Sequence, residues 1–273
     1  MATVPDNFLL ARERDRNATT RGHFGAYAHH REQQMALLQG LSGKRIAILG
    51  AGNCNDIDLP TLAKAFSEIH LFDIDAESLT CALAEQPSEV QGACHPHVRD
   101  LTGIASFLEQ WRSNTPEPMA AQLAAWTQLA ELVDEVGAFD VVISTCMLSQ
   151  VAINLRDFFG IVPALNSALC AAIAGHVMLA ATLTQPGGTL IIVSDCITNR
   201  FPIYEETERR GALEAIFHLA AQGAAFPGTE PSLIHDLLAG SNIGQTEFKN
   251  AWIWALSPSQ TYLVYALQGT RGS

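Results

Sequence analysis

The residues best suited to bind a ligand lie in the stretch ILGAGNCNDIDL, residues 48–59, where Gly50 and Gly52 stand on either side of an alanine. A strand followed by Gly-x-Gly and a helix brings backbone N–H groups close to a bound molecule. Dinucleotide-binding loops carry a third glycine, three residues after the second, that lets the helix pack closely on the strand. That position is Asn55 here, so the loop indicates a ligand site but departs from the dinucleotide pattern.

The charges of the loop bear on the kind of ligand. Asp56 and Asp58 occupy the part of the loop where a pyrophosphate would lie. Acids near a helix N-terminus suit the helix dipole, but they repel a second anion. We therefore expect a ligand with an ammonium group and without phosphates.

Alternating strand and helix patterns indicate the fold that positions this loop. Apolar runs predict strands at 44–50, 68–75, 92–98, 139–145 and 189–196, followed by a hairpin at 251–257 and 260–268. Helical spacing appears at 59–67 and 76–86, over 102–136 with a break at 114–119, and at about 163–185, where QPGG ends the helix in a turn. Such alternation requires a mostly parallel sheet covered on both faces, an α/β doubly wound fold.

Five motifs in this order resemble those of the class I S-adenosylmethionine-dependent methyltransferases. The motifs are RIAILGAGNCNDIDL, IHLFDIDAESL, VRDLTGI, FDVVISTCMLSQV and LTQPGGTLIIVSD, and they span residues 44–198. The resemblance implies a seven-stranded Rossmann-like sheet with an antiparallel last strand, and a cofactor at the carboxyl ends of the first four strands. S-adenosylmethionine has an ammonium, a carboxylate and a sulfonium but no phosphate, as the charges of the loop favour.

The resemblance also implies where the cofactor contacts lie. Gly50, Ala51 and Gly52 would approach the methionine part, for which Asn53, Asn55 or Asp56 supplies a polar contact, because Ile48 stands where the family carries an acid. After the second strand, Asp73 would bind the ribose hydroxyls and Ile74 would lie beside the adenine. After the third strand, Asp100 would bind the amino group of the adenine and Leu101 would lie beside its ring. Thr145 and Cys146, after the fourth strand, complete the expected contacts.

The acceptor side is expected on two segments outside the strands. The first is an N-terminal helical arm, residues 1–42, whose stretch 23–38 would cover the cofactor with Tyr27, His29 and His30. A histidine is a suitable general base, so His29 or His30 is the expected proton acceptor. Met147 and Tyr204 are the other expected substrate contacts. The rest of the chain, 43–273, would form the methyltransferase domain, with a helical insertion at about 200–248.

Composition narrows the partners. The 273 residues carry a net charge of −12, which opposes binding to nucleic acid or to an anionic membrane. The Asn-Pro-Pro-Tyr signature of nucleic-acid amino methyltransferases is absent after the fourth strand. The expected acceptor is therefore a small molecule, and the product of the cofactor would be S-adenosylhomocysteine.

Other features give structural expectations. The six cysteines form no C-x-x-C pair, and CHPH at 94–97 lacks a second ligand cluster, so we expect no metal. The apolar stretch 168–183 is expected to be a core helix, and the first residues contain only a four-residue apolar run, so we expect a cytoplasmic protein. RERDR at 12–16 alternates in sign and indicates a solvated helix face. Asp75 is expected to cap a helix, and His176 to be a core histidine.

Three alternatives remain open from the sequence. Aminopropyl or aminocarboxypropyl transfer would use the same site. An NAD(P)-dependent oxidoreductase or a nucleotide-sugar enzyme would need small residues at positions 54 and 55, which are Cys and Asn. A non-catalytic S-adenosylmethionine-binding protein is compatible with Ile48, and the sequence also leaves a homodimer open.

Overall fold

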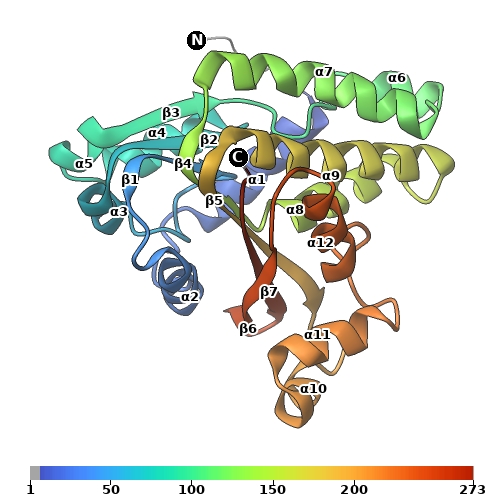
Figure 1. Cartoon of the computed structure of the whole chain (residues 1–273). Coiled ribbons are helices and arrows are strands. Elements are labelled where there is room, and N and C mark those ends of the chain that lie inside the picture. The colour runs from blue at the N-terminus through green and yellow to red at the C-terminus, as the bar shows by residue number, and fades with distance from the viewer. Residues whose placement is uncertain (1–6, 273) are drawn as a thin grey trace.

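The computed structural model describes residues 7–272, and its centre is a seven-stranded sheet (Figure 1). The strand order is β3-β2-β1-β4-β5-β7-β6, and β7 runs antiparallel to both of its neighbours. The strands are β1 (Gly43–Leu49), β2 (Phe66–Asp73), β3 (Cys94–Val98), β4 (Phe139–Thr145), β5 (Thr184–Thr198), β6 (Glu247–Ser257) and β7 (Gln260–Thr270). The predicted doubly wound fold with an antiparallel strand near one edge is confirmed.

Helices cover both faces of this sheet (Figure 1). In the described part of the chain they are α1 (Phe8–Thr20), α2 (Ala28–Leu38), α3 (Leu59–Ala65), α4 (Ala76–Ala84), α5 (Ser88–Ala93), α6 (Leu108–Ser113), α7 (Pro118–Val136), α8 (Met147–Phe159), α9 (Pro163–Leu183), α10 (Ile203–Arg210), α11 (Ala212–Ala220) and α12 (Pro231–Ala239). Successive residues of β1 point to opposite faces: Ile46 and Ile48 join the core under α2 to α5, whereas Ala47 and Leu49 join the core under α7 to α9.

The helix α9 is the long apolar element that the sequence places in the core. By length and composition it could cross a membrane, but 78% of its most apolar window is buried inside the protein. Its His176 is fully buried, with Nε2 2.8 Å from Ser144 Oγ and Nδ1 3.2 Å from the Leu101 carbonyl oxygen. The expectations of a core helix and a core histidine are confirmed.

Two local features differ from the sequence expectations. The helix α8 was not predicted; it begins at Met147, and the one residue that separates it from β4 is its N-cap Cys146, whose φ of 49° lies in the left-handed region. The segment QPGG does not form a turn between elements, because β5 already begins at Thr184. Residues 185–188 instead form a bulge in β5, since Phe139 pairs with Thr184 and Val141 with Thr189.

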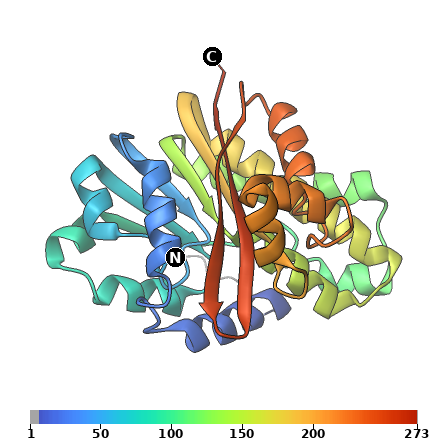
Figure 2. The same ribbon diagram turned by 90° about the horizontal axis from the view of Figure 1, so that it is seen from below.

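The two N-terminal helices attach to the sheet domain in different ways. The helix α1 is capped by Asn7, whose side chain accepts from the Leu10 N–H, and it lies across the carboxyl ends of the strands. The helix α2 contributes Leu38, together with the adjoining Tyr27, to the same apolar core as Trp252 of β6. The β6–β7 hairpin, red in Figure 2, contacts this segment through Trp254 of β6, whose ring lies against Tyr27 and against His30 of α2. Residues 1–6 of the expected arm lie outside the described residues.

Candidate functional site

The glycine loop after β1 is fixed by the ends of its two neighbouring strands. The N–H groups of Gly50 and Ala51 both donate to the Phe72 carbonyl oxygen, at 2.9 and 3.0 Å. Thr145 Oγ1 donates to the Gly50 carbonyl oxygen at 2.9 Å. A Cβ at Gly50 would lie 3.3 Å from the Thr145 carbonyl oxygen, and its φ is +82°, so glycine is required here. The loop therefore presents bare backbone at the carboxyl edge of the sheet.

Asp73 ends β2 and faces this loop. Its carboxylate accepts hydrogen bonds from the N–H of Gly52 at 2.8 Å and of Asp75 at 2.9 Å, and the residue is only 8% exposed. Burial raises the pKa of Asp73 to about 7, against the two backbone bonds, and the negative charge of Glu13 raises it further. Asp75 accepts from the Glu77 N–H, which confirms its expected role as the cap of α4.

Two adjoining hollows lie beyond the carboxyl ends of β1, β2 and β4, where open α/β sheets bind their ligands. The Asp100 hollow is lined by Leu9, Glu13, Gly50, Asp73, Ile74, Arg99, Asp100, Leu101, Thr102, Met147, Gln150, Val151 and Asn154. The glycine-loop hollow is lined by Glu13, Arg16, Asn17, Thr20, Tyr27, Gly50, Ala51, Gly52, Asn53, Asn55, Asp56, Asp73, Cys146, Gln150 and Trp254.

Most of the residues expected to bind a cofactor meet at these two hollows. Those that line at least one hollow are Gly50, Ala51, Gly52, Asn53, Asp73, Ile74, Asp100, Leu101 and Cys146, and Met147 and Tyr27 of the expected substrate contacts lie with them. Thr145 lines neither hollow and acts on the loop through its bond to Gly50. Asp100 also holds its own turn, because its carboxylate accepts from the N–H groups of Thr102 and Ala105 at 2.8 and 2.9 Å.

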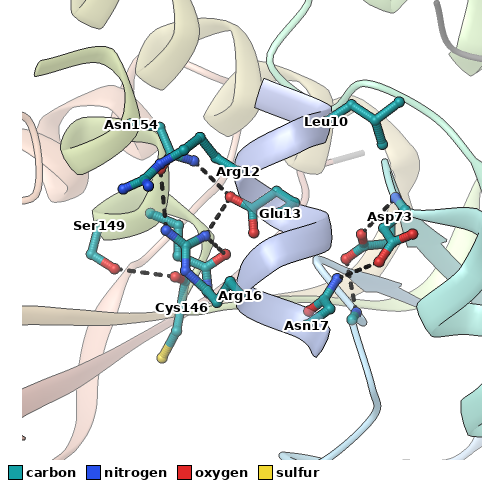
Figure 3. Close-up of polar contacts among 12 residues, drawn as sticks. Leu10, Arg12, Glu13, Arg16, Asn17, Asp73, Cys146, Ser149 and Asn154 are labelled. Atoms are coloured by element: carbon teal, nitrogen blue, oxygen red, sulfur yellow. Dashed lines mark hydrogen bonds and ion pairs between the residues drawn. The ribbon is translucent and has the colours of Figure 1, made fainter. Parts of the chain in front are cut away.

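The helix α1 crosses between the two hollows, and Glu13 lines both of them (Figure 3). The Glu13 carboxylate accepts from Arg16 and, at 2.7 Å, from Asn154 Nδ2 of α8. Arg16 also donates to Gln150 and Asn154, at 3.2 Å each. The side chains of Glu13 and Arg16 are only 15% and 28% exposed. The expected solvated face at 12–16 is confirmed for Arg14 and Asp15, which are exposed, but not for Glu13 and Arg16, because α1 docks this side on α8.

Further polar contacts hold α1 at its edges. Arg12 pairs with Asp157 of α8 at 2.8 Å, and Asn17 Nδ2 donates to Asp75 Oδ2 at 3.0 Å. The Arg12 and Asp157 side chains are 42% and 40% exposed. Exposed ion pairs of this kind contribute about 1 kcal/mol at most. The cover over the hollows is thus attached by polar contacts along its length and by its first turn, where Leu9 joins the core and Phe8 packs on Phe158.

The expected bases on α2 lie in unlike surroundings. His30 is fully buried, and its ring stacks on Trp254 at a centroid distance of 4.0 Å. Trp252 Nε1 donates to His30 Nδ1 at 3.1 Å; since an indole nitrogen only donates, the proton of His30 lies on Nε2. Burial lowers the pKa of His30 to about 3. His30 is therefore a neutral ring whose acceptor nitrogen is already occupied.

Two other expected site residues are not brought to the cleft. His29 lines neither hollow; its side chain is 60% exposed, with Nδ1 4.0 Å from Glu32. Tyr204 lies on α10 and is 53% exposed, and its hydroxyl contacts Thr261 Oγ1 at 3.4 Å. In this structure neither side chain can contact a ligand held in the two hollows.

Cys146 stands between the glycine-loop hollow and a buried acid. Its Sγ lies 3.6 Å from His30 Nε2, and Ser149 behind it donates to Asp195 at 2.6 Å. Burial, together with the charge of Asp195, raises the pKa of the Cys146 thiol well above its usual value. The thiol is therefore protonated, and it contributes shape rather than a nucleophile.

Asp56 ends the polar part of the loop and lines the glycine-loop hollow. Its side chain is 20% exposed, and its Oδ2 lies 4.0 Å from His30 Nε2. Burial raises the pKa of Asp56 to about 7, while a hydrogen bond from Gln34 and the charge of Arg31 lower it. Among residues 7–272 no group of three or more His, Cys, Asp or Glu side chains is placed to hold a metal ion.

Sequence reasoning missed the contribution of α1 and α8. The residues concerned are Glu13, Arg16, Asn17, Gln150 and Asn154. Gln150 lies in the motif FDVVISTCMLSQV, but the resemblance implies no role for it, and the other four lie outside the five motifs. One signal was available: Gln150 and Asn154 are four residues apart, so a helix there would place them on one face. Without the prediction of α8, that spacing had no meaning.

Comparison with known proteins agrees on the fold. No protein-family model and no curated protein sequence matches the chain. The YcgJ protein from Bacillus subtilis has a similar structure, with a TM-score of 0.51 and 10% identity over 90% of this chain and 99% of that one. Magnesium protoporphyrin IX methyltransferase from Synechocystis PCC 6803, solved with bound S-adenosylmethionine, has a TM-score of 0.47 and 15% identity over 92% and 81% of the two chains. N-methyltransferase NodS from Bradyrhizobium japonicum WM9 has a TM-score of 0.45 and 11% identity over 93% and 99%. The sheet order and the antiparallel β7 are those of the class I methyltransferase fold.

Proposed function

We propose that the protein is an S-adenosylmethionine-dependent methyltransferase that transfers a methyl group to a small-molecule acceptor. One observation carries the proposal: the fixed glycine loop, the buried Asp73 and the covering helix α1 together enclose two adjoining hollows at the ligand edge of this fold. The structural likeness to a protein solved with bound S-adenosylmethionine agrees with this ligand.

The Asp100 hollow suits an adenosine. Asp73 retains lone pairs beyond its two backbone bonds and would accept from the ribose hydroxyls. Ile74 and Met147 would lie against the base, and the Leu101 N–H and the Asp100 carboxylate would bind its edge. Acceptors and apolar walls therefore match a nucleoside, and neither Asp73 nor Asp100 favours a phosphate.

The glycine-loop hollow suits an amino-acid group. Ile48 is fully buried in the core and offers no charge there, whereas α1 brings charges of both signs. Glu13 would face the α-ammonium of the methionine part, and Arg16 would face its carboxylate. The bare backbone of Gly50 and Gly52 would allow the chain of that part to pass close to the loop.

Bound S-adenosylmethionine supplies a methyl group on a positively charged sulfur. The contribution of the protein is to hold the acceptor in line with that group and to exclude water. The helix α1 covers the junction of the two hollows, so it would provide the exclusion (Figure 3). The net charge of −12 favours a small acceptor over a nucleic acid.

Calorimetric titration with S-adenosylhomocysteine and with NADH tests the proposal. We expect micromolar affinity for S-adenosylhomocysteine and none for NADH, because Asp56 and Asp58 lie where a pyrophosphate would. Binding of NADH would contradict the proposal in favour of an oxidoreductase. Binding of S-adenosylhomocysteine without methyl transfer to any acceptor of a broad panel would indicate a non-catalytic binding protein.

A further inference from the structure

Asp56 is a largely buried acid, with a side chain 20% exposed, and the cofactor contacts proposed from the structure leave it unused. Its carboxylate faces the glycine-loop hollow beside Tyr27 and Trp254. Among residues 7–272 no Lys or Arg forms an ion pair with it. The nearby Arg31 is held elsewhere: its guanidinium donates to the carbonyl oxygens of Phe24 and Asn55, at 2.9 and 2.7 Å. The carboxylate is thus available to a cation inside the hollow.

The other carboxylates that line this hollow are already engaged: Glu13 accepts from Arg16 and Asn154, and Asp73 accepts from the N–H groups of Gly52 and Asp75. His30 lies behind Asp56, but Trp252 occupies its Nδ1 and its Nε2 carries the proton. Arg16 is the one cation that lines the hollow within the described chain, and it is bound to Glu13, Gln150 and Asn154. Near the end of β4, Asp56 is therefore the group that can both attract a cation and take a proton.

We propose that the methyl acceptor is an amine, which binds as its ammonium ion against Asp56 beside Tyr27 and Trp254 and gives its proton to that carboxylate. The inference rests on the proposed methyltransferase function and specifies its substrate class. The two aromatic rings, 5.1 Å apart between centroids and each over nine-tenths buried, would contact the carbon skeleton next to the nitrogen.

The reaction balances as follows. A proton leaves the ammonium nitrogen for the Asp56 carboxylate, and the freed lone pair forms a bond to the methyl carbon. The carbon–sulfur bond breaks, and its electron pair stays on sulfur, which becomes a neutral thioether. The product is a methylated ammonium ion, and the proton on Asp56 passes to solvent as the product leaves.

The titration of Asp56 fits this role. Because burial raises its pKa to about 7, the carboxylate can accept a proton near neutral pH and release it again. Asp195 nearby raises the pKa as well, whereas Gln34 and Arg31 lower it. Below about pH 7 the group is increasingly protonated and neutral, so binding of an ammonium ion should weaken as the pH falls.

Three probes of one shape test the charge preference. Benzylamine, benzyl alcohol and benzoate are titrated calorimetrically into the full-length protein saturated with S-adenosylhomocysteine. At pH 8 we expect benzylamine to bind about tenfold or more tightly than benzyl alcohol, as for a charge-assisted hydrogen bond, and benzoate to bind least. The preference for benzylamine over benzyl alcohol should decrease as the pH is lowered from 8 to 6. This comparison uses only the wild-type protein, so it does not depend on the folding of a variant. Equal affinity for the amine and the alcohol would overturn the inference.

Two matched variants locate the charge. Asp56→Asn should abolish the preference for benzylamine and leave the affinity for S-adenosylhomocysteine within about threefold. Asp58→Asn, two residues away on the exposed cap of α3, should change neither, since asparagine caps helices as well as aspartate. If Asp56→Asn instead loses S-adenosylhomocysteine, Asp56 is a cofactor residue and the inference is wrong. If the wild type does not bind S-adenosylhomocysteine at all, the proposed function itself fails.

Discussion

Replacing Glu13 by glutamine tests whether α1 recognises the charged end of the cofactor. The Glu13 carboxylate lines both hollows and is held by Asn154 and Arg16, so its position does not depend on a ligand. Its side chain is 15% exposed, and a charge-assisted hydrogen bond there is worth about 1.5–3 kcal/mol. Glu13→Gln should therefore lower the affinity for S-adenosylhomocysteine by about tenfold to a hundredfold.

The ligand can be shortened in parallel with the side chain. Methylthioadenosine has the same nucleoside and thioether but lacks the ammonium and the carboxylate. Its affinity should change by less than about threefold in Glu13→Gln, because it offers Glu13 no charge. Calorimetry on the four combinations of protein and ligand gives the coupling directly.

Arg12→Gln is the matched control on the same helix. It breaks the exposed pair with Asp157 and does not line either hollow, so any effect reports the docking of α1 alone. We expect it to affect both ligands equally, by about fivefold at most. If Glu13→Gln also weakens both ligands equally, Glu13 only helps to dock α1, and the reasoning about the ammonium is refuted.

Three further perturbations follow from the structure. Asp73→Ala should weaken the binding of S-adenosylhomocysteine, measured by calorimetry, by at least about tenfold. Asp75→Ala should mainly lower the free energy of unfolding in urea, by about 1 kcal/mol, because Asp75 caps α4 and holds Asn17. Equal effects of the two variants on affinity would contradict the assignment. Deleting residues 1–22 removes α1 but keeps Tyr27 in the apolar core that it shares with α2, so circular dichroism should show a folded protein. Unchanged affinity of this protein for S-adenosylhomocysteine would show that α1 is not a cover. The raised pKa of Asp56 means that the folded state binds more protons than the unfolded state between about pH 4 and 7, so this group contributes less stability as the pH rises. From pH 5 to pH 8 the free energy of unfolding of Asp56→Asn, measured in urea, should therefore rise by roughly 1–2 kcal/mol relative to that of the wild type. If the two proteins show parallel dependences on pH, the pKa of Asp56 is not raised.

The sheet could be predicted from the sequence because its signals are local. Strands buried on both faces are continuous apolar runs, and β1, β2 and β4 end at a glycine, an aspartate or a cap, where the ligand edge must lie. For that reason Gly50, Asp73 and Asp100 could be placed at one edge before their contacts were known. The bonds of the Asp73 and Asp100 carboxylates to backbone N–H groups, and of the Gly50 N–H to the Phe72 carbonyl oxygen, agree with this placement.

The helix α8 could not be predicted because its start gives no local signal. Met147 follows β4 with one intervening residue, and that residue, Cys146, adopts a left-handed conformation usual for glycine or asparagine. No glycine or proline separates strand from helix. The apolar run of β4 continues into the apolar face of α8. The spacing of apolar residues therefore changes from that of a strand to that of a helix without a visible break in the sequence.

The same limit applies to the residues of α1. The alternating charges at 12–16 are typical of a solvated helix, and the helix is solvated on one side. Whether Glu13 faces water or a cleft depends on Asn154, which lies 141 positions further along the chain. No local pattern encodes a contact of that separation, so a site built by docking α1 on α8 becomes visible only in the folded chain.

Of the residues expected to form the cover, Tyr27 lines the glycine-loop hollow, whereas His29 and His30 line neither hollow. The segment that begins at Tyr27 is bound by aromatic packing: His30 stacks on Trp254, and Tyr27 contacts the same ring. The helix α1 is buried at its first turn through Leu9 and Leu10, but its second half is bound by polar side chains, several of them partly exposed, and such contacts separate more easily than a buried aromatic cluster. Between the two, Gly22 has a φ of +78° with open space around its Cα. If a ligand enters beneath Glu13, we therefore expect α1 to move about the segment near Gly22, while α2 stays in place as a wall.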